Sequence, residues 1–413
     1  MLSVSGRNPI TKDSQVSIRG SGININVRKN WGSTNVPNLL QFRCERLSSV
    51  YGIGPSQGLW LVAAAALACG GSAAPPTTDM EFSEPTEWAP ETYVAYRTDT
   101  RLVIDGKLDE SVWRSAEWTR SFVDIEGSLR PPPRFNTQAK LLWDDLYFYV
   151  AAEMEEPHVW SKLTDRDAVI YYDNDFEVFI DPDGDTHEYY ELEINAFGTE
   201  WDLLLVRPYR DGGPAINAWD IRGLKTAVSV DGTINRPDDR DRGWSVEIAI
   251  PWAVLKEAAN KPAPPKPGDQ WRVNFSRVQW RTIIENGEYV RELDNSPGRT
   301  RPEDNWVWSP QGLINMHYPE MWGIVQFSAS LSGLGNDSVT VSIEDRAKWE
   351  LRRVYYRQHA WFDTHQSFAD RLGDLGLGES DWPITLAATR NLFEATLEVN
   401  GKTLRIRQDG RVW

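Results

Sequence analysis

The sequence of 413 residues predicts a mainly β fold, an antiparallel β-sandwich that is followed by a small C-terminal α+β module. Between residues 93 and 328, short runs alternate apolar with polar side chains and are rich in β-branched and aromatic residues. Turn-forming residues separate these runs at short intervals, as they do between antiparallel strands. The period then changes, because residues 344–372 place apolar and aromatic side chains at steps of three and four. This change predicts a long amphipathic helix.

The predicted strands of the sandwich follow one another closely along the chain. They are residues 102–105, two strands within 139–154, and then 175–181, 189–198, 200–210, 224–235, 243–252, 270–280 and 320–328. A helix is predicted over residues 251–260, because Pro251 stands at its first turn and good helix formers follow. In the C-terminal module, Asn400-Gly401 and Asp409-Gly410 are hairpin signals, so strands are expected over residues 383–413.

The N-terminal part is interpreted as an export signal followed by a flexible linker rather than as a folded domain. Residues 1–69 contain an apolar run, 59–68, that is shorter than the roughly 20 residues needed to span a bilayer. The run fits the core of a signal peptide, and the "ALAC" that ends at Cys69 resembles a bacterial lipoprotein signal. That resemblance implies export and a lipid on Cys69, with the protein in the cell envelope, anchored to the outer membrane or periplasmic. The alternative is that Cys69 is only a small residue of the leader. Residues 70–91, rich in Pro, Ser and Thr, are predicted to be a flexible linker.

Charge and cysteine content exclude several classes of function. The formal charge is −16, and the first 80 residues are net positive, so the body of the chain is strongly acidic. Such a surface repels a phosphate backbone, and we expect no nucleic acid partner. The two cysteines are Cys44 and Cys69, so the part after the leader holds no disulfide, cysteine nucleophile or zinc-cysteine cluster. The five histidines show no HExxH spacing, and no GxSxG elbow or phosphate loop is present.

Six blocks of sequence, taken together and in order, carry a family resemblance. They are residues 103–117, 141–154, 173–195, 243–252, 271–280 and 305–328. Over residues 93–328 the chain resembles carbohydrate-binding module family 9, in its stand-alone family 9-like branch. The resemblance implies a jelly-roll or DOMON-like β-sandwich at residues 92–330, binding to the ends of sugar chains, an aromatic clamp on one sugar ring, and structural calcium. Residues 340–413 lie outside it. Trp113, in the first block, is expected to be a plug in the core.

Candidate sugar-binding residues come from aromatic rings and from a polar strip. Flat rings bind the C–H faces of a pyranose, and polar groups around them bind its hydroxyls. The resemblance places a clamp ring at Trp308, with Trp306 two residues earlier, and leaves Trp160 and Tyr172 as alternatives for the second ring. The polar residues with the expected positions are Glu177, Glu193 and Asn195 on two paired strands, and Arg277. The alternative is that these polar residues form a solvated sheet face.

A possible structural Ca²⁺ site is predicted at Asp181, Asp183 and Asp185, which alternate around a tight turn. The stretch does not fit an EF-hand, because the sixth position from Asp181 is Thr186 and the twelfth is Leu192. It is first a hairpin loop, and any calcium there would be bound by a different kind of site.

The expected function is the binding of an oligosaccharide or polysaccharide by an exported, non-catalytic β-sandwich, in support of carbohydrate catabolism. Membrane association is expected only through the lipid at Cys69. Three alternatives stay open: a glycoside hydrolase or its accessory subunit, a purely structural surface lipoprotein, and a haem-binding sandwich. Acids are so numerous that composition alone does not exclude a pair of catalytic carboxylates.

Overall fold

The computed structural model describes residues 16–20, 23–27, 83–85, 87–294, 298–378 and 380–413. The chain divides into two units, residues 1–76 and 77–413. In the first unit, β1 (Val16–Gly20) and β2 (Ile23–Val27) pair antiparallel. Cys69 and most of the predicted linker lie outside the described residues. Within the described part, no helix has the length and apolarity that crossing a membrane requires.

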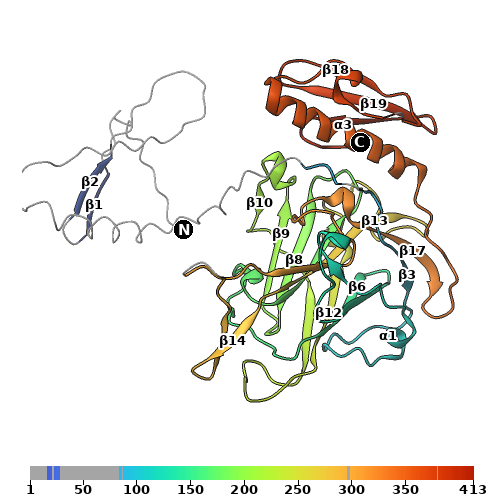
Figure 1. The fold of residues 1–413 in the computed structure, drawn as a ribbon. Helices are drawn as coiled ribbons and strands as arrows, with labels where there is room; N and C mark the ends of the chain where they lie inside the picture. The colour runs from blue at the N-terminus through green and yellow to red at the C-terminus, as the bar shows by residue number, and fades with distance from the viewer. Residues whose placement is uncertain (1–15, 21–22, 28–82, 86, 295–297, 379) are drawn as a thin grey trace, which may run out of the picture. The chain divides into compact units, whose positions relative to one another are not determined.

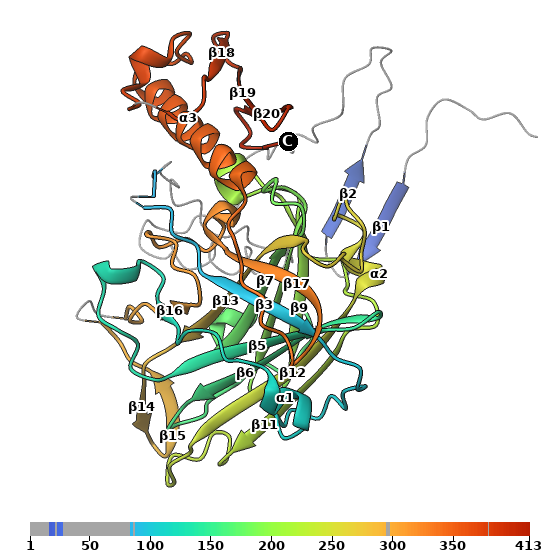
Figure 2. The same ribbon diagram turned by 90° about the vertical axis from the view of Figure 1, so that its right-hand side faces the viewer.

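The second unit is built on one large, mostly antiparallel sheet that folds over into a sandwich (Figures 1 and 2). Its strands are β3 (Thr92–Arg97), β4 (Val123–Asp124), β5 (Thr137–Trp143), β6 (Tyr147–Glu155), β7 (Asp175–Asp181), β8 (Tyr189–Asn195), β9 (Glu200–Leu205), β10 (Ala215–Ile216), β11 (Lys225–Asp231), β12 (Gly243–Pro251), β13 (Gln270–Gln279), β16 (Asp304–Val307) and β17 (Gly323–Leu331). The order is β10-β9-β8-β7-β13-β17-β3-β5-β6-β12-β11, and β16 pairs with β13 and β4. The two pairings of β3, with β17 and β5, are parallel. A separate hairpin consists of β14 (Thr282–Glu285) and β15 (Glu288–Arg291).

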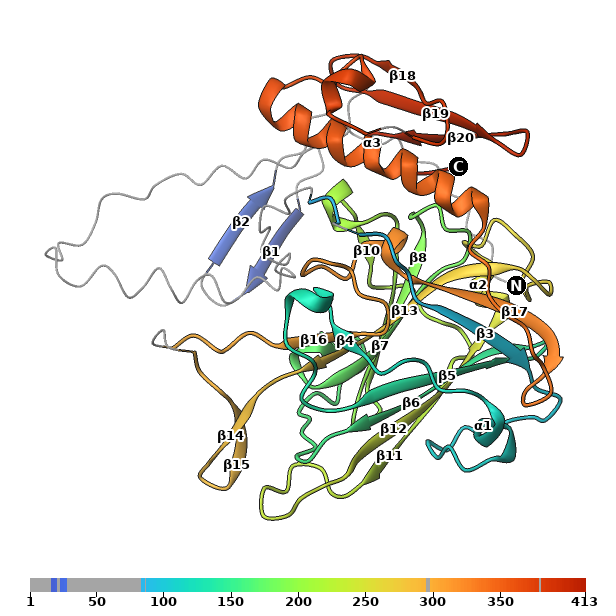
Figure 3. The ribbon, with the colours of Figure 1, turned by 45° about the vertical axis from the view of Figure 1, so that its right-hand side comes forward.

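The predicted fold class is confirmed, and the alternation in the sequence explains how the core forms. Along β7, Phe176, Val178 and Ile180 belong to the main core, while the residues between them point to the other face. Strands of both layers contribute to this core, with rings such as Trp244 and Trp271 filling its centre. Figure 3 shows β5, β6, β12 and β11 side by side in one layer, with β7 and β8 behind them.

Short helices and turns close the ends of the sandwich. The α1 helix (Ser111–Ser115) places Trp113 in the core, as predicted, and its indole N–H donates to Glu247 at 2.7 Å. The α2 helix is shorter than predicted, Trp252–Leu255, because the residues after it turn away as a loop. The 3₁₀ turns are η1 (Gly127–Leu129), η2 (Ile170–Tyr172), η3 (Tyr209–Asp211), η4 (Pro319–Met321) and η5 (Leu372–Leu375).

The C-terminal module is a long helix on a three-stranded sheet. The α3 helix (Ile343–His365) begins at Ser342, whose hydroxyl accepts from the Asp345 N–H, and it is shorter at its C-terminus than predicted. The sheet has the order β18 (Thr385–Ala388), β19 (Phe393–Val399), β20 (Lys402–Arg407). Asn400 and Gly401 both have positive φ, which fits the hairpin predicted there. The predicted boundaries of the sandwich and the module stay predictions.

The module packs on the sandwich through a buried ionic network. Arg210 of η3 and Arg352 of α3 both face the carboxylate of Glu320, and their side chains are 1–2% exposed. The Tyr356 hydroxyl donates to the same carboxylate, and the Tyr355 hydroxyl donates to Asp211 at 2.6 Å. The two arginines hold the pKa of Glu320 at about 2, against the effect of its burial. We call Arg210, Glu320 and Arg352 the interface network.

Candidate functional site

One row of side chains crosses four neighbouring strands on the outer face of the β7 layer. The pairing register places Trp201 of β9 beside Glu193 of β8, Glu193 beside Glu177 of β7, and Glu177 beside Ser276 of β13. Cross-strand neighbours have Cβ atoms about 4.5–5.5 Å apart, so a ring, two carboxylates and a hydroxyl stand together. The predicted strip of Glu177 and Glu193 is therefore formed, with an aromatic ring at its end.

Two more carboxylates join the pair from the same two strands. Asp175 precedes Glu177 by two residues and Glu191 precedes Glu193 by two, so all four side chains share one face. All four are at most 6% exposed. We call Asp175, Glu177, Glu191 and Glu193 the acidic face. Oxygens from Asp175, Glu177 and Glu193 all lie within 4.8 Å of one another.

Burial and mutual repulsion shift the acidic face toward its protonated forms. Loss of hydration raises the pKa of Glu177 to about 7, and a hydrogen bond from Ser276 opposes this rise. The pKa values of Asp175, Glu191 and Glu193 are also raised, first by burial and then by the neighbouring carboxylates. The Tyr171 N–H donates to Glu193 at 2.9 Å, and the Val278 N–H donates to Asp175 at 3.1 Å. One oxygen of Asp175 and one of Glu191 have no hydrogen-bond partner.

Aromatic rings border the acidic face. Tyr171 lies 6.3 Å from Trp201 and 4.8 Å from Tyr172, measured between ring centroids. The charges of Glu191 and Glu193 act on Tyr209, so this phenol is also near the carboxylates. Tyr171, Trp201 and Tyr209 are half-buried and Tyr172 is exposed. The sequence reasoning missed Trp201, Tyr171 and Tyr209, because only the cross-strand register and the turn at η2 bring these rings beside the acids.

A cavity of about 490 Å³ lies at β16 and the loops on either side of it. Its wall includes Trp306, Arg134 and Glu303, and the charge of Glu303 also raises the pKa of Glu177. Trp306 is 2% exposed, with the guanidinium groups of Arg134 and Arg277 over its ring. Cavities of 300–1,000 Å³ are the usual size for small-molecule sites.

The predicted tryptophan clamp is not assembled on the surface. Trp308 is 2% exposed and packs in the main core against Tyr93 and Phe275, so no ring face is open to a sugar. Trp160 is also 2% exposed, in a small cluster with Trp280. Trp308 follows directly after β16 and fills the main core, whereas Trp160 belongs to a separate small cluster, so neither ring offers a face to a sugar in this arrangement. Tyr172, at 48% exposure, is open to solvent as a ligand ring must be.

Two of the predicted polar contacts are already used inside the protein. Asn195 donates to Leu163 and Asp173 and accepts from the backbone of Phe197 and Thr199. Arg277 is fully buried, with its donors on Gln279, Thr137 and the carbonyl of Glu155. Both side chains are thus engaged inside the protein in this arrangement, and their binding of sugar stays a prediction.

The loop at Asp181, Asp183 and Asp185, which we call the aspartate loop, gathers its carboxylates as predicted, within 4.8 Å of one another. Protein groups already donate to all six carboxylate oxygens. The donors are the backbone N–H groups of Gly184, Asp185, Thr186 and His187, the Asn260 amide and the Arg411 guanidinium. Lys348 of α3 donates to the carbonyl oxygens of Asp183 and Gly184. Calcium at this loop stays a prediction, but the loop does not need an ion to satisfy its acids.

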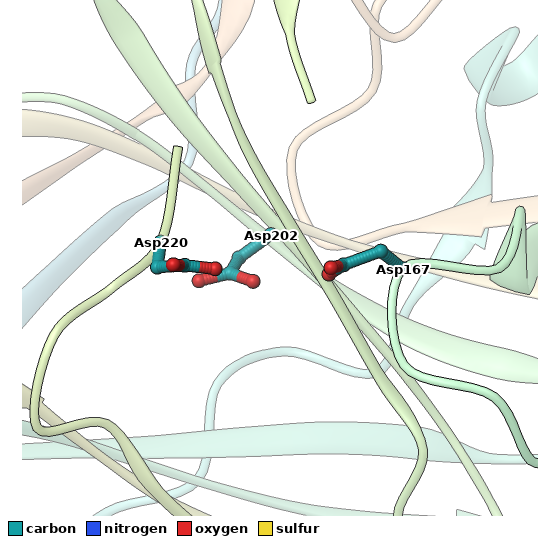
Figure 4. Close-up of side chains that lie close together, drawn as sticks. All are labelled: Asp167, Asp202 and Asp220. Carbon is teal, nitrogen blue, oxygen red and sulfur yellow. The ribbon is translucent and has the colours of Figure 1, made fainter. Parts of the chain in front are cut away.

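A third group of acids is also neutralised by the protein. Figure 4 shows Asp167, Asp202 and Asp220 brought together from separate segments. The guanidinium of Arg166 forms ion pairs with all three and with Glu200. This group is therefore a charge network around an arginine, and it leaves the acidic face as the cluster without a protein cation.

Part of this chain matches a model of a known protein family. Residues 104–266 match the family model described as "Carbohydrate family 9 binding domain-like". That segment contains β5 to β9 and all four carboxylates of the acidic face. Trp306 and the C-terminal module lie outside the matched residues.

Two curated relatives are similar over less than half of this chain. The chain is 28% identical over 177 residues to exoglucanase XynX of Acetivibrio thermocellus, which covers 43% of this chain and 13% of that enzyme. It is 29% identical over 153 residues to endo-1,4-beta-xylanase A of Thermoanaerobacterium saccharolyticum, 37% of this chain and 11% of the enzyme. The similarity thus concerns a small part of each enzyme.

Solved structures of family 9 modules are also similar. A module from Caldicellulosiruptor kristjanssonii in complex with cellotriose aligns with a TM-score of 0.38 and 17% identity, over 61% of this chain and 99% of the module. A module from the same organism in complex with glucose gives a TM-score of 0.37 and 17% identity, over 60% of this chain and all of the module.

Proposed function

We propose that the sandwich binds carbohydrate, without catalysing its hydrolysis, at the acidic face and the rings beside it. The observation that carries the proposal is the row of Trp201, Glu193, Glu177 and Ser276 across four paired strands. A pyranose needs an apolar ring for its C–H face and acceptors for its hydroxyls, and this row offers both side by side. The match of residues 104–266 to the family 9 model supports the same ligand class.

The ligand class also agrees with the charge of the site. The negative charge that these buried carboxylates carry when they are ionised disfavours an anionic ligand, such as a phosphorylated or strongly acidic glycan. Carboxylates accept pairs of hydrogen bonds from neutral hydroxyls, which suits an uncharged sugar. The cavity at Trp306 and Glu303 would accept a second unit of an oligosaccharide.

Calorimetric titration of the whole protein with gluco- and xylo-oligosaccharides tests the proposal. We expect binding that falls about tenfold or more in Trp201→Ala, the loss of one stacking ring. Trp413→Ala is the matched control, since Trp413 is 42% exposed on the C-terminal module and its removal leaves the site intact. No heat with any sugar, or equal affinity in Trp201→Ala and wild type, refutes the proposal. Release of reducing ends from the same substrates would instead support the hydrolase alternative.

We further propose that the protein is exported and carries a lipid on Cys69, which would hold the sandwich at the cell envelope in support of polysaccharide catabolism. The support is the apolar run that ends in "ALAC". In a bacterial host, the wild type should fractionate with membranes and Cys69→Ser should not. Equal distribution of the two proteins would exclude the anchor.

A further inference from the structure

We propose that the acidic face binds a divalent cation of the Ca²⁺ type, held by Asp175, Glu177 and Glu193 with Glu191 beside them. The inference deepens the proposed function, because the same carboxylates would then present a cation, rather than bare oxygens, to sugar hydroxyls. It differs from the calcium predicted at the aspartate loop, which lies at the far end of β7.

The contrast among the three acidic clusters of the described residues carries the argument. Arg166 forms ion pairs throughout the cluster at Asp202, and Arg411 pairs with Asp185 of the aspartate loop. In the part of the chain that the structure describes, no carboxylate of the acidic face forms an ion pair. Buried charges without partners are among the costliest features of a protein interior, so a folded chain that keeps these carboxylates ionised needs a compensating charge.

Unsatisfied oxygens point to where that charge binds. One oxygen of Asp175 and one of Glu191 are buried and have no hydrogen-bond partner, and the two residues are 0% and 6% exposed. Glu191 points toward the cluster, since it stands on the same face of β8 as Glu193, and the charge of Glu177 acts strongly on it. Both unpartnered oxygens thus belong to the acidic face.

The dimensions suit a calcium-sized ion. Ca²⁺ is bound by six to eight oxygens at about 2.3–2.6 Å, so ligand oxygens on opposite sides of the ion are about 4.6–5.2 Å apart. The cluster oxygens lie within 4.8 Å of one another. The nearby cation Arg277 donates to Gln279, Thr137 and Glu155, and its ion pair is with Glu156, which lies outside the face. Ser276 and Tyr171 complete the surroundings without adding charge.

Calorimetric titration of chelator-treated protein with CaCl₂, in the absence of sugar, tests the inference. We expect a site whose affinity falls at least tenfold in Glu193→Gln and in Glu177→Gln, which preserve the shape of the side chain. Asp183→Asn is the matched control in the aspartate loop and should keep the site that the two glutamine variants weaken. Far-UV circular dichroism and the melting temperature of each variant show whether it is folded, and two independent variants guard against the loss of one.

Several results would overturn the inference. Wild-type protein that binds neither Ca²⁺, Mg²⁺ nor Mn²⁺ at millimolar concentration would show that the face is neutralised by protons instead. Binding that survives both glutamine variants and is lost in Asp183→Asn would assign the ion to the aspartate loop. Because these titrations contain no sugar, a cation site without sugar binding would refute only the proposed function.

Discussion

The interface network and the acidic face are both buried groups of charged residues, yet they are built in opposite ways. In the network, Glu320 is shared by Arg210 and Arg352, and burial of the carboxylate is outweighed by two guanidinium groups. In the acidic face, the carboxylates have one another, the Ser276 hydroxyl and a few backbone N–H groups, and no protein cation among the described residues forms an ion pair with them. The pKa of Glu320 is lowered to about 2, whereas that of Glu177 is raised to about 7.

The difference separates a structural role from a binding role. A protein gains nothing from burying four unpaired acids on one face of a sheet unless something else binds there, because the cost to stability is large. The interface network needs no such partner, since each of its charges has an opposite charge beside it inside the chain. The C-terminal module is thus a source of cations for the sandwich, through Arg352, Lys348 and Arg411.

The largest change in stability is expected when the interface network is broken. Glu320→Ala leaves Arg210 and Arg352 buried without their shared partner, which should destabilise the protein by about 3–5 kcal/mol. Denaturant unfolding of the full chain measures this loss. Glu344→Ala is the control, because its ion pair with Lys402 is solvent-exposed and should change stability by no more than about 1 kcal/mol. Equal effects of the two changes would show that the network contributes no more than a surface pair.

A smaller loss is expected where the C-terminal module contacts the aspartate loop. Lys348→Met removes two hydrogen bonds to the loop carbonyls and a positive charge near Asp181, and should cost about 1–3 kcal/mol. The exposed Lys107→Met is the control and should be nearly neutral. If the loop binds calcium, 1 mM CaCl₂ should restore part of the stability of Lys348→Met. No difference between the two lysine variants would remove the module's role at this loop.

Much of the fold could be predicted from the sequence, because strand alternation and turn signals are local. The same locality identified Glu177 and Glu193 as neighbours, since each belongs to one of two strands joined by a single loop. Burial of Trp308 could not be predicted, because its environment comes from Tyr93 and Gly323, and a Cβ at that glycine would lie 2.4 Å from the indole. Trp201, which was not identified from the sequence, likewise lies beside the acids only because of the register of a third strand.

The basic side chains that contact the aspartate loop could not be predicted from the sequence either. Lys348 and Arg411 come from a module that follows the loop by more than 150 residues, and no local pattern connects them. The spacing of the three aspartates indicated a metal site, and their tertiary partners show why such a spacing does not require one.

The smallest change in stability is expected in the acidic face, and it has the opposite sign. Without a cation, Glu193→Gln removes one repelling charge while its amide oxygen still accepts from Tyr171, so stability should rise by about 1–2 kcal/mol at pH 7.5. Raised pKa values mean that the folded state binds protons that the unfolded chain has released above about pH 4.5. The contribution of the face to stability therefore falls as the pH rises from 4.5 through 7.

Buried histidines have the opposite effect on the pH dependence of stability. The pKa values of His187, His317 and His359 are lowered, so stability rises with pH up to about 6.5. The measurement is therefore the difference in unfolding free energy between wild type and Glu193→Gln, which cancels the histidines. This difference should be near zero at pH 4.5, grow up to pH 7.5, and shrink when saturating Ca²⁺ is added to the wild type. A difference that does not change with pH would mean that the acidic face is neutralised by something other than protons or a cation, and the contrast with the interface network would no longer hold.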